Sequence, residues 1–187
     1  MELERITDYI DSYLDIHSYH DDSANGLQVE NTGNVKKIGL AVDACHESIS
    51  RACRAGCDLL IVHHGLFWGS QQLIVDNHYQ RIRALIMADL ALYAAHIPLD
   101  AHPIIGHNRV IAEHLDLEDI EPFALHHGKH IGVKGRFRQS GSRAEAAIWI
   151  EKELGACRGL LEFGPETIST VAVVAGSATD IELFREL

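Results

Sequence analysis

The sequence contains no apolar run that approaches the ~20 residues of a membrane span. Its first residues, Met1 to Arg5, are largely acidic and lack the basic and apolar regions of a signal peptide. Basic residues are also scarce, because 16 Lys and Arg stand against 27 Asp and Glu, and the net charge of -11 disfavours nucleic acid as a partner. We therefore expect a cytoplasmic protein that binds neither membranes nor nucleic acid.

Several common catalytic and binding motifs are missing as well. The sequence has no G-x-x-x-x-G-K-[ST] or G-x-G-x-x-G loop for phosphates and no G-x-S-x-G turn for a serine nucleophile. Its 4 cysteines form no C-x-x-C pair. Cys53 and Cys57 lie one turn apart on a predicted helix, which is more typical of reduced core thiols than of zinc ligands.

The hydrophobic pattern predicts an α/β fold with a mostly parallel sheet flanked by helices. Hydrophobic residues make up 47% of the 187 residues, enough for a sizeable core. Short apolar runs that are typical of buried strands alternate with amphipathic helical segments. The predicted strands are 35–42, 57–62 and 90–95, and the predicted helices are 3–14, 44–55, 77–88 and 107–115.

The pattern of short apolar strands alternating with helices ends near Leu117. We therefore expect a main α/β domain that holds the metal site (1–115), followed by an inserted α+β domain (116–166). The chain then returns to the main domain (167–187), which we expect to be truncated. Within the insert, residues 131–138 alternate as in an antiparallel strand, and Ser142 to Glu145 form a capping box that opens a helix to Leu154. We also expect strands at 158–163 and 170–175, and a second capping box at 179–182.

Potential metal ligands follow the predicted strands. His63 and His64 come directly after the apolar run 59–62, Asp43 follows the first strand, and His96 follows the third, with Asp100 four residues later. Imidazole is the commonest protein metal ligand. Since ligands bind beyond the carboxyl ends of parallel strands, these residues should meet at one edge of the sheet.

Other interpretations of these residues remain open. Adjacent residues of a strand point to opposite faces of the sheet, so His63 and His64 can bind the same ion only if the strand has already bent at this point. Alternatively, each histidine binds one ion of a pair, and Asp100 bridges the two ions. Without a metal, the two histidines would cap the strand and Asp100 would belong to a turn. We interpret Asp43 as the N-cap of the helix that begins at Ala44, and His96 as a residue behind the ligands. Mixed His and carboxylate ligation favours zinc, iron or manganese.

Four strings occur in an order that resembles the Nif-three-like family, also called GTP cyclohydrolase I type 2-like. They are Asn-Gly-Leu-Gln-Val at 25–29, Gly-Leu-Ala-Val-Asp at 39–43, Val-His-His-Gly-Leu-Phe-Trp at 62–68 and Ala-Ala-His-Ile-Pro-Leu-Asp-Ala-His at 94–102. The resemblance implies a dinuclear metal centre in which His63, His64 and Asp100 match family ligands. It also implies a toroidal homohexamer and opening of the guanine ring of GTP, or of a related heterocycle, by a metal-activated water.

One departure from the family pattern limits this expectation. The family's remaining ligands, a His and a Glu, lie in a C-terminal segment, whereas no His follows Thr170 here. The resemblance therefore implies weak or single-ion binding for this chain, with two ions in a complete site, and no residue is assigned as general acid or base. The alternatives to a hydrolase are a non-catalytic, metal-binding oligomeric adaptor and an inactive truncated relative.

Overall fold

The computed structural model of the chain describes residues 1–176 and residue 183. These residues form two compact units, Met1–Leu99 and Asp100–Leu187. The elements of the first unit are α1 (Leu3–Leu14), β1 (Gly26–Val29), β2 (Ile38–Asp43), α2 (His46–Ala55), β3 (Leu59–His64), α3 (Asp76–Met87) and β4 (Ala91–Ala94). The short helix α4 (Ile97–Asp100) leads into the second unit, which contains α5 (His107–His114), β5 (Glu118–His126), β6 (Lys129–Ser142), α6 (Arg143–Leu154) and β7 (Thr167–Val173).

The first unit is built on a four-stranded sheet with the order β1-β4-β3-β2. Strands β2, β3 and β4 run parallel, and β1 pairs antiparallel with β4. Helix α2 connects β2 to β3, and α3 connects β3 to β4, as parallel pairing requires. The predicted fold class, a mostly parallel sheet flanked by helices, is confirmed.

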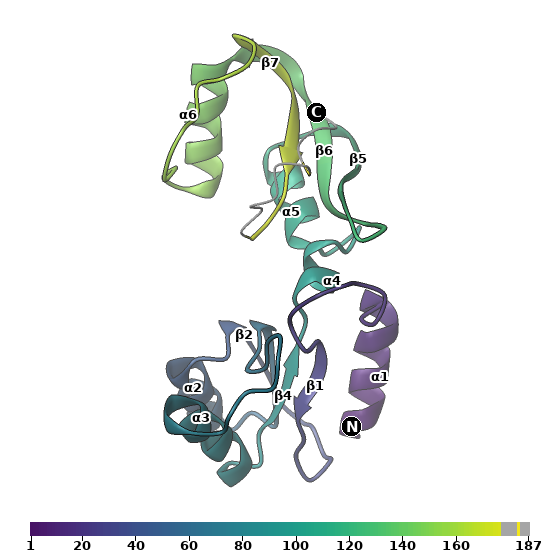
Figure 1. Cartoon of the computed structure of the whole chain (residues 1–187), viewed down its shortest axis with the longest axis vertical. Coiled ribbons are helices and arrows are strands. Elements are labelled where there is room, and N and C mark those ends of the chain that lie inside the picture. Colours follow the sequence, from purple (N-terminus) through teal and green to yellow (C-terminus); the bar gives the residue numbers. More distant parts are fainter. Residues whose placement is uncertain (177–182, 184–187) are drawn as a thin grey trace. The chain divides into compact units, whose positions relative to one another are not determined.

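Helices cover both faces of this sheet (Figure 1). The apolar stripe of α1, including Leu3 and Ile6, packs with Tyr93 on one face. On the other face, Ile49 of α2 and Leu85 of α3 are fully buried against the strands. All of β4 is buried, which explains why its sequence is continuously apolar rather than alternating.

Strand β2 lies at the outer edge of the sheet and differs from β4 in its burial. Leu40 is 79% exposed and Val42 is 62% exposed. Among the described residues, only β3 pairs with β2, so half of the backbone polar groups of β2 face no strand.

The second unit contains a three-stranded antiparallel sheet with the order β5-β6-β7. Its core joins residues of α5 and α6, such as Ala112 and Ala146, to Phe137 and Val173 of the sheet. The capping box predicted at Ser142 is present, since the Ser142 hydroxyl accepts from the Glu145 backbone N–H and the Glu145 carboxylate accepts from the Ser142 backbone N–H. The helix that it opens ends at Leu154 as expected.

Two strand predictions differ from the structure of the second unit. The strand expected at 158–163 is wrong, because these residues form an exposed coil and β7 makes the sheet pairing instead. The strand expected at 170–175 begins earlier, at Thr167, and pairs antiparallel with β6. The capping box at 179–182 lies outside the described residues, and the division into a main domain and an insert at 116–166 stays a prediction.

Candidate metal centre

The carboxyl ends of the parallel strands bring polar side chains together at one edge of the first unit's sheet. Asp43 of β2 stands opposite His64 of β3 in the strand register. On the other side of β3, the Ala95 N–H donates to the Val62 carbonyl at 2.9 Å, which places His96 just beyond the end of β4. The convergence of Asp43, the histidine pair and His96 is therefore confirmed within this unit.

Three histidine rings form the centre of this group. The ring centroids of His63 and His64 are 4.6 Å apart, and those of His63 and His96 are 4.9 Å apart. One ligand atom from each of the three rings lies within 4.8 Å of the others, so the group could hold a metal ion. The strand does not end before the histidine pair, since β3 includes both residues, yet the two rings still lie side by side.

The hydrogen bonds of the three rings fit metal ligation. The Nδ1 atom of His63 lies 2.9 Å from the Ala95 carbonyl oxygen. The Nδ1 atom of His64 lies 2.7 Å from a carboxylate oxygen of Asp43. The Nδ1 atom of His96 lies 2.9 Å from a carboxylate oxygen of Asp21. Because a carbonyl or an ionised carboxylate can only accept, each Nδ1 must carry the hydrogen, which leaves each Nε2 lone pair available to a metal. Metal-binding histidines typically have such an oxygen partner behind them.

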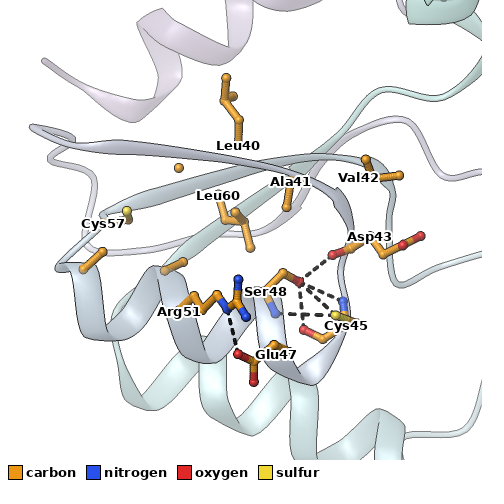
Figure 2. Close-up of a pocket in the computed structure, with 13 residues that line it drawn as sticks. Leu40, Ala41, Val42, Asp43, Cys45, Glu47, Ser48, Arg51, Cys57 and Leu60 are labelled. Carbon is orange, nitrogen blue, oxygen red and sulfur yellow. Dashed lines mark hydrogen bonds and ion pairs between the residues drawn. The ribbon is translucent and has the colours of Figure 1, made fainter. Parts of the chain in front are cut away.

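The Asp43 carboxylate that contacts His64 belongs to the last residue of β2, where the turn to α2 begins. Figure 2 shows the hydrogen bonds of this turn among Asp43, Cys45 and Ser48. The Ser48 hydroxyl lies 2.5 Å from the Asp43 carbonyl oxygen, and the Cys45 N–H donates to the Ser48 hydroxyl at 3.0 Å. Cys45, rather than Asp43, is the N-cap of α2. The interpretation of Asp43 as an N-cap is therefore wrong, because its carboxylate is bonded to the histidine instead.

Asp21 accepts several hydrogen bonds, a role that the sequence alone does not reveal. Its carboxylate accepts from the backbone N–H groups of Ser23 at 2.9 Å and Ile97 at 3.0 Å, from the Asn25 side chain at 2.8 Å, and from His96. Burial alone would raise the pKa of Asp21, but these hydrogen bonds outweigh it and lower the pKa from 3.8 to about 2. Only the turn residues Asn25 and Gly26 marked this loop in the sequence, and they gave no sign of a role for Asp21.

We expect Asp21→Asn to destabilise the first unit at neutral pH by about 1–3 kcal/mol, because the amide group offers one acceptor oxygen where the carboxylate offers two. A lowered pKa stabilises the folded state above the unfolded pKa of 3.8, and this contribution is lost as the pH falls toward about 2. The stability difference between wild type and Asp21→Asn should therefore narrow over that window. Urea unfolding at pH 7 and at successively lower pH would measure it.

The control for this variant is Asp22→Asn, since Asp22 is the exposed neighbour of Asp21. It should unfold like the wild type at every pH. A stability difference between wild type and Asp21→Asn that stays constant from neutral pH to pH 2 would contradict the assigned role.

Trp68 borders the histidine group and a neighbouring cavity. Its ring lies 4.9 Å from that of His96 and 6.0 Å from that of His64, and its indole N–H donates to the Gly65 carbonyl at 3.0 Å. Asp21, Phe67 and Trp68 line the cavity, which has a volume of about 430 Å³. A small planar molecule would fit beside the histidine group at this point.

Asp100 is the first residue of the second unit. Its carboxylate is buried, and one oxygen lies 2.6 Å from His107 Nδ1. Its backbone carbonyl accepts from the Asn108 side chain at 3.0 Å. The participation of Asp100 in a common site with His63 and His64 stays a prediction.

Comparison with known proteins identifies relatives over almost the whole chain. The model of a family described as Duf34/NIF3 (NGG1p interacting factor 3) matches residues 1–186. Proteins named "GTP cyclohydrolase 1 type 2 homolog" are 41% identical over 174 residues in Deinococcus radiodurans and 42% identical over 178 residues in Pyrococcus abyssi. A crystal structure of a Thermus thermophilus protein is 36% identical, with a TM-score of 0.86 over 100% of the chain.

The chain is shorter than these relatives. The match to the Deinococcus protein includes 93% of this chain but 66% of that protein. The match to the Pyrococcus protein includes 95% of this chain and 71% of that protein, and the structural alignment covers 74% of the Thermus chain. Among the described residues, no helix is long and apolar enough to cross a membrane.

Proposed function

Because the chain belongs to the Duf34/NIF3 family, we propose that it is a metal-dependent hydrolase that opens the ring of a purine nucleotide such as GTP. The observation that carries this proposal is the group of three histidine rings whose Nδ1 atoms are all bonded to oxygen acceptors. The relatives' name, GTP cyclohydrolase 1 type 2 homolog, supports this class of substrate.

In this proposal His63, His64 and Asp100 hold the metal, and a complete site holds two ions. Zinc, iron or manganese suits this mixture of imidazole and carboxylate donors. A divalent ion of this kind supplies, when bound, the activation of a water molecule near neutral pH. Asp43 keeps the His64 ring in place, and Asp21 does the same for His96, which offers a third nitrogen at the same edge.

The cavity beside Trp68 is the proposed place for the base of the nucleotide. Phe67 and Trp68 provide an aromatic surface for a planar ring, within reach of the histidine group. As further parts of the proposal, the protein acts in the cytoplasm and assembles as a toroidal homohexamer. Size-exclusion chromatography with light scattering would determine the assembly.

The test is loss of GTP in the presence of added manganese or zinc, followed by chromatography and ultraviolet absorbance. We expect turnover that depends on the metal, stops with a chelator and is absent from His64→Ala. His130→Ala is the matched control, because His130 is an exposed histidine in the second unit, and it should retain turnover.

The outcomes separate the three candidate functions. Metal binding and assembly without loss of GTP would replace the hydrolase proposal with the non-catalytic adaptor. Absence of both metal binding and turnover would indicate an inactive relative.

A further inference from the structure

We propose that the second unit carries a separate binding site for a small phosphorylated ring compound of about the size of a mononucleotide. The site is a cavity of about 800 Å³ on the β5-β6-β7 sheet, bordered by the coil that precedes β7. This volume lies within the ~300–1,000 Å³ typical of small-molecule sites. None of the histidines of the candidate metal centre lines it.

The cavity lies next to a break in the pairing of β6 with β7. Arg136 pairs with Thr170 and Gly141 pairs with Ile168, so β6 advances by five residues while β7 advances by two. The extra residues of β6 interrupt the ladder between the strands. Such bulges are over-represented beside functional sites, where they redirect side chains.

Three basic residues (Lys134, Arg136 and Arg143) and two acidic ones (Asp119 and Glu121) line the cavity, so positive charge is in slight excess there. Lys134 and Arg136 lie on one face of β6, because residues two apart on a strand point to the same side. Lys134 forms an ion pair with Glu121, in which the Lys134 Nζ atom lies 3.3 Å from a carboxylate oxygen. Arg136 is exposed and has no acidic partner in the part of the chain that the structure describes, although Arg138 on the same strand contacts both Asp116 and Glu118. An unpaired guanidinium is suited to bidentate binding of phosphate.

An aromatic side chain also lines the cavity. Phe163 is 82% exposed, and hydrogen bonds from Arg143, the first residue of α6, contact the coil that contains it. The Arg143 guanidinium donates to the Gly164 carbonyl at 3.0 Å, and the Arg143 backbone N–H donates to the Glu166 carbonyl at 3.0 Å. A planar ring stacked on Phe163 would remove this apolar surface from water, while a phosphate on the same molecule reaches Arg136.

The combination of an unpaired guanidinium and an exposed aromatic ring in one cavity defines the ligand class. Inorganic phosphate alone would contact only the basic side, and a neutral nucleoside only the aromatic side. A phosphorylated ring compound contacts both, so its affinity should exceed that of either fragment.

The test is calorimetric titration of the full chain with AMP, adenosine and inorganic phosphate, in the presence of a chelator. We expect AMP to bind at least tenfold more tightly than either fragment. Arg136→Gln should weaken AMP binding at least tenfold and leave adenosine unchanged, whereas Phe163→Ala should weaken both AMP and adenosine. Both side chains are exposed, so circular dichroism should show unchanged folding.

Arg158→Gln is the matched control, because it removes the same charge from an exposed arginine of the second unit outside the cavity, and it should bind AMP like the wild type. His64→Ala should also bind AMP normally, which separates this site from the proposed metal-dependent activity. A weak site would have a dissociation constant on the order of 1 mM, so AMP at about 10 mM should nearly saturate it. Absence of AMP binding at that concentration would overturn the proposal. Equal losses of AMP binding in Arg136→Gln and Arg158→Gln would overturn it too.

Discussion

Replacing His64 with alanine is expected to abolish most of the stabilisation that a divalent metal gives to the fold. Metal at 100 times its dissociation constant should stabilise the wild type by about 2.7 kcal/mol, which for a chain of this size raises Tm by roughly 5–10 °C. Loss of residues behind a ligand typically weakens metal binding 10–100-fold, and loss of a ligand should cost more. At the same metal concentration, a 100-fold weaker variant would gain only about 0.4 kcal/mol.

Thermal unfolding with and without a chelator, combined with metal analysis of the purified protein, would measure this effect. Asp43→Asn should give an intermediate shift, because it leaves the His64 ring in the site but removes an oxygen from its carboxylate partner. His130→Ala should shift like the wild type. Equal chelator-sensitive shifts in His64→Ala and the wild type would remove His64 from the metal site.

Leu92→Ala should cost about 2–5 kcal/mol of the free energy of unfolding. Leu92 is fully buried in β4, which lies between β1 and β3, and its side chain belongs to the core beneath α2 and α3. Truncation removes buried apolar surface and leaves a cavity that the surrounding strands fill only in part. Urea unfolding followed by circular dichroism at neutral pH would give the difference.

The matched control is Leu40→Ala, the same substitution on the edge strand of the same sheet. Leu40 is 79% exposed, so its truncation should change the stability by less than about 0.5 kcal/mol. Similar losses in the two variants would mean that β2 is buried in solution by a contact that the described residues do not make.

The parallel sheet of the first unit, and the edge at which the histidines gather, could be predicted because apolar residues recur at regular spacings along this part of the sequence. Each strand is a short apolar run, each connecting helix shows one apolar face, and a polar residue follows where the strand ends. Parallel topology then brings Asp43, His64 and His96 to one edge with no knowledge of their side-chain orientation. The helix α1 and the capping box at Ser142 were predictable for the same local reasons.

The hydrogen bonds around the histidines could not be predicted, because they depend on residues that are distant in sequence. Asp21 is 75 residues from His96, and nothing in its polar neighbourhood distinguishes it from a solvated loop residue. Asp43 stands where N-cap residues stand, and only the strand register shows that His64 is its partner. The coil at 158–163 is apolar enough to suggest a strand, but β6 pairs with β7, which follows this coil in the sequence.

Asp43, the partner of His64 in the candidate metal centre, lies on the edge strand β2. Backbone amides of β4 are bonded within the sheet between two neighbours, so their hydrogens should exchange with solvent slowly, while the outward amides of β2 should exchange quickly. Fraying of β2 alone would separate Asp43 from His64 and leave the buried core intact. We therefore expect His64 to lose its Asp43 partner whenever β2 frays, and an ion bound at the candidate centre should slow deuterium uptake along β2.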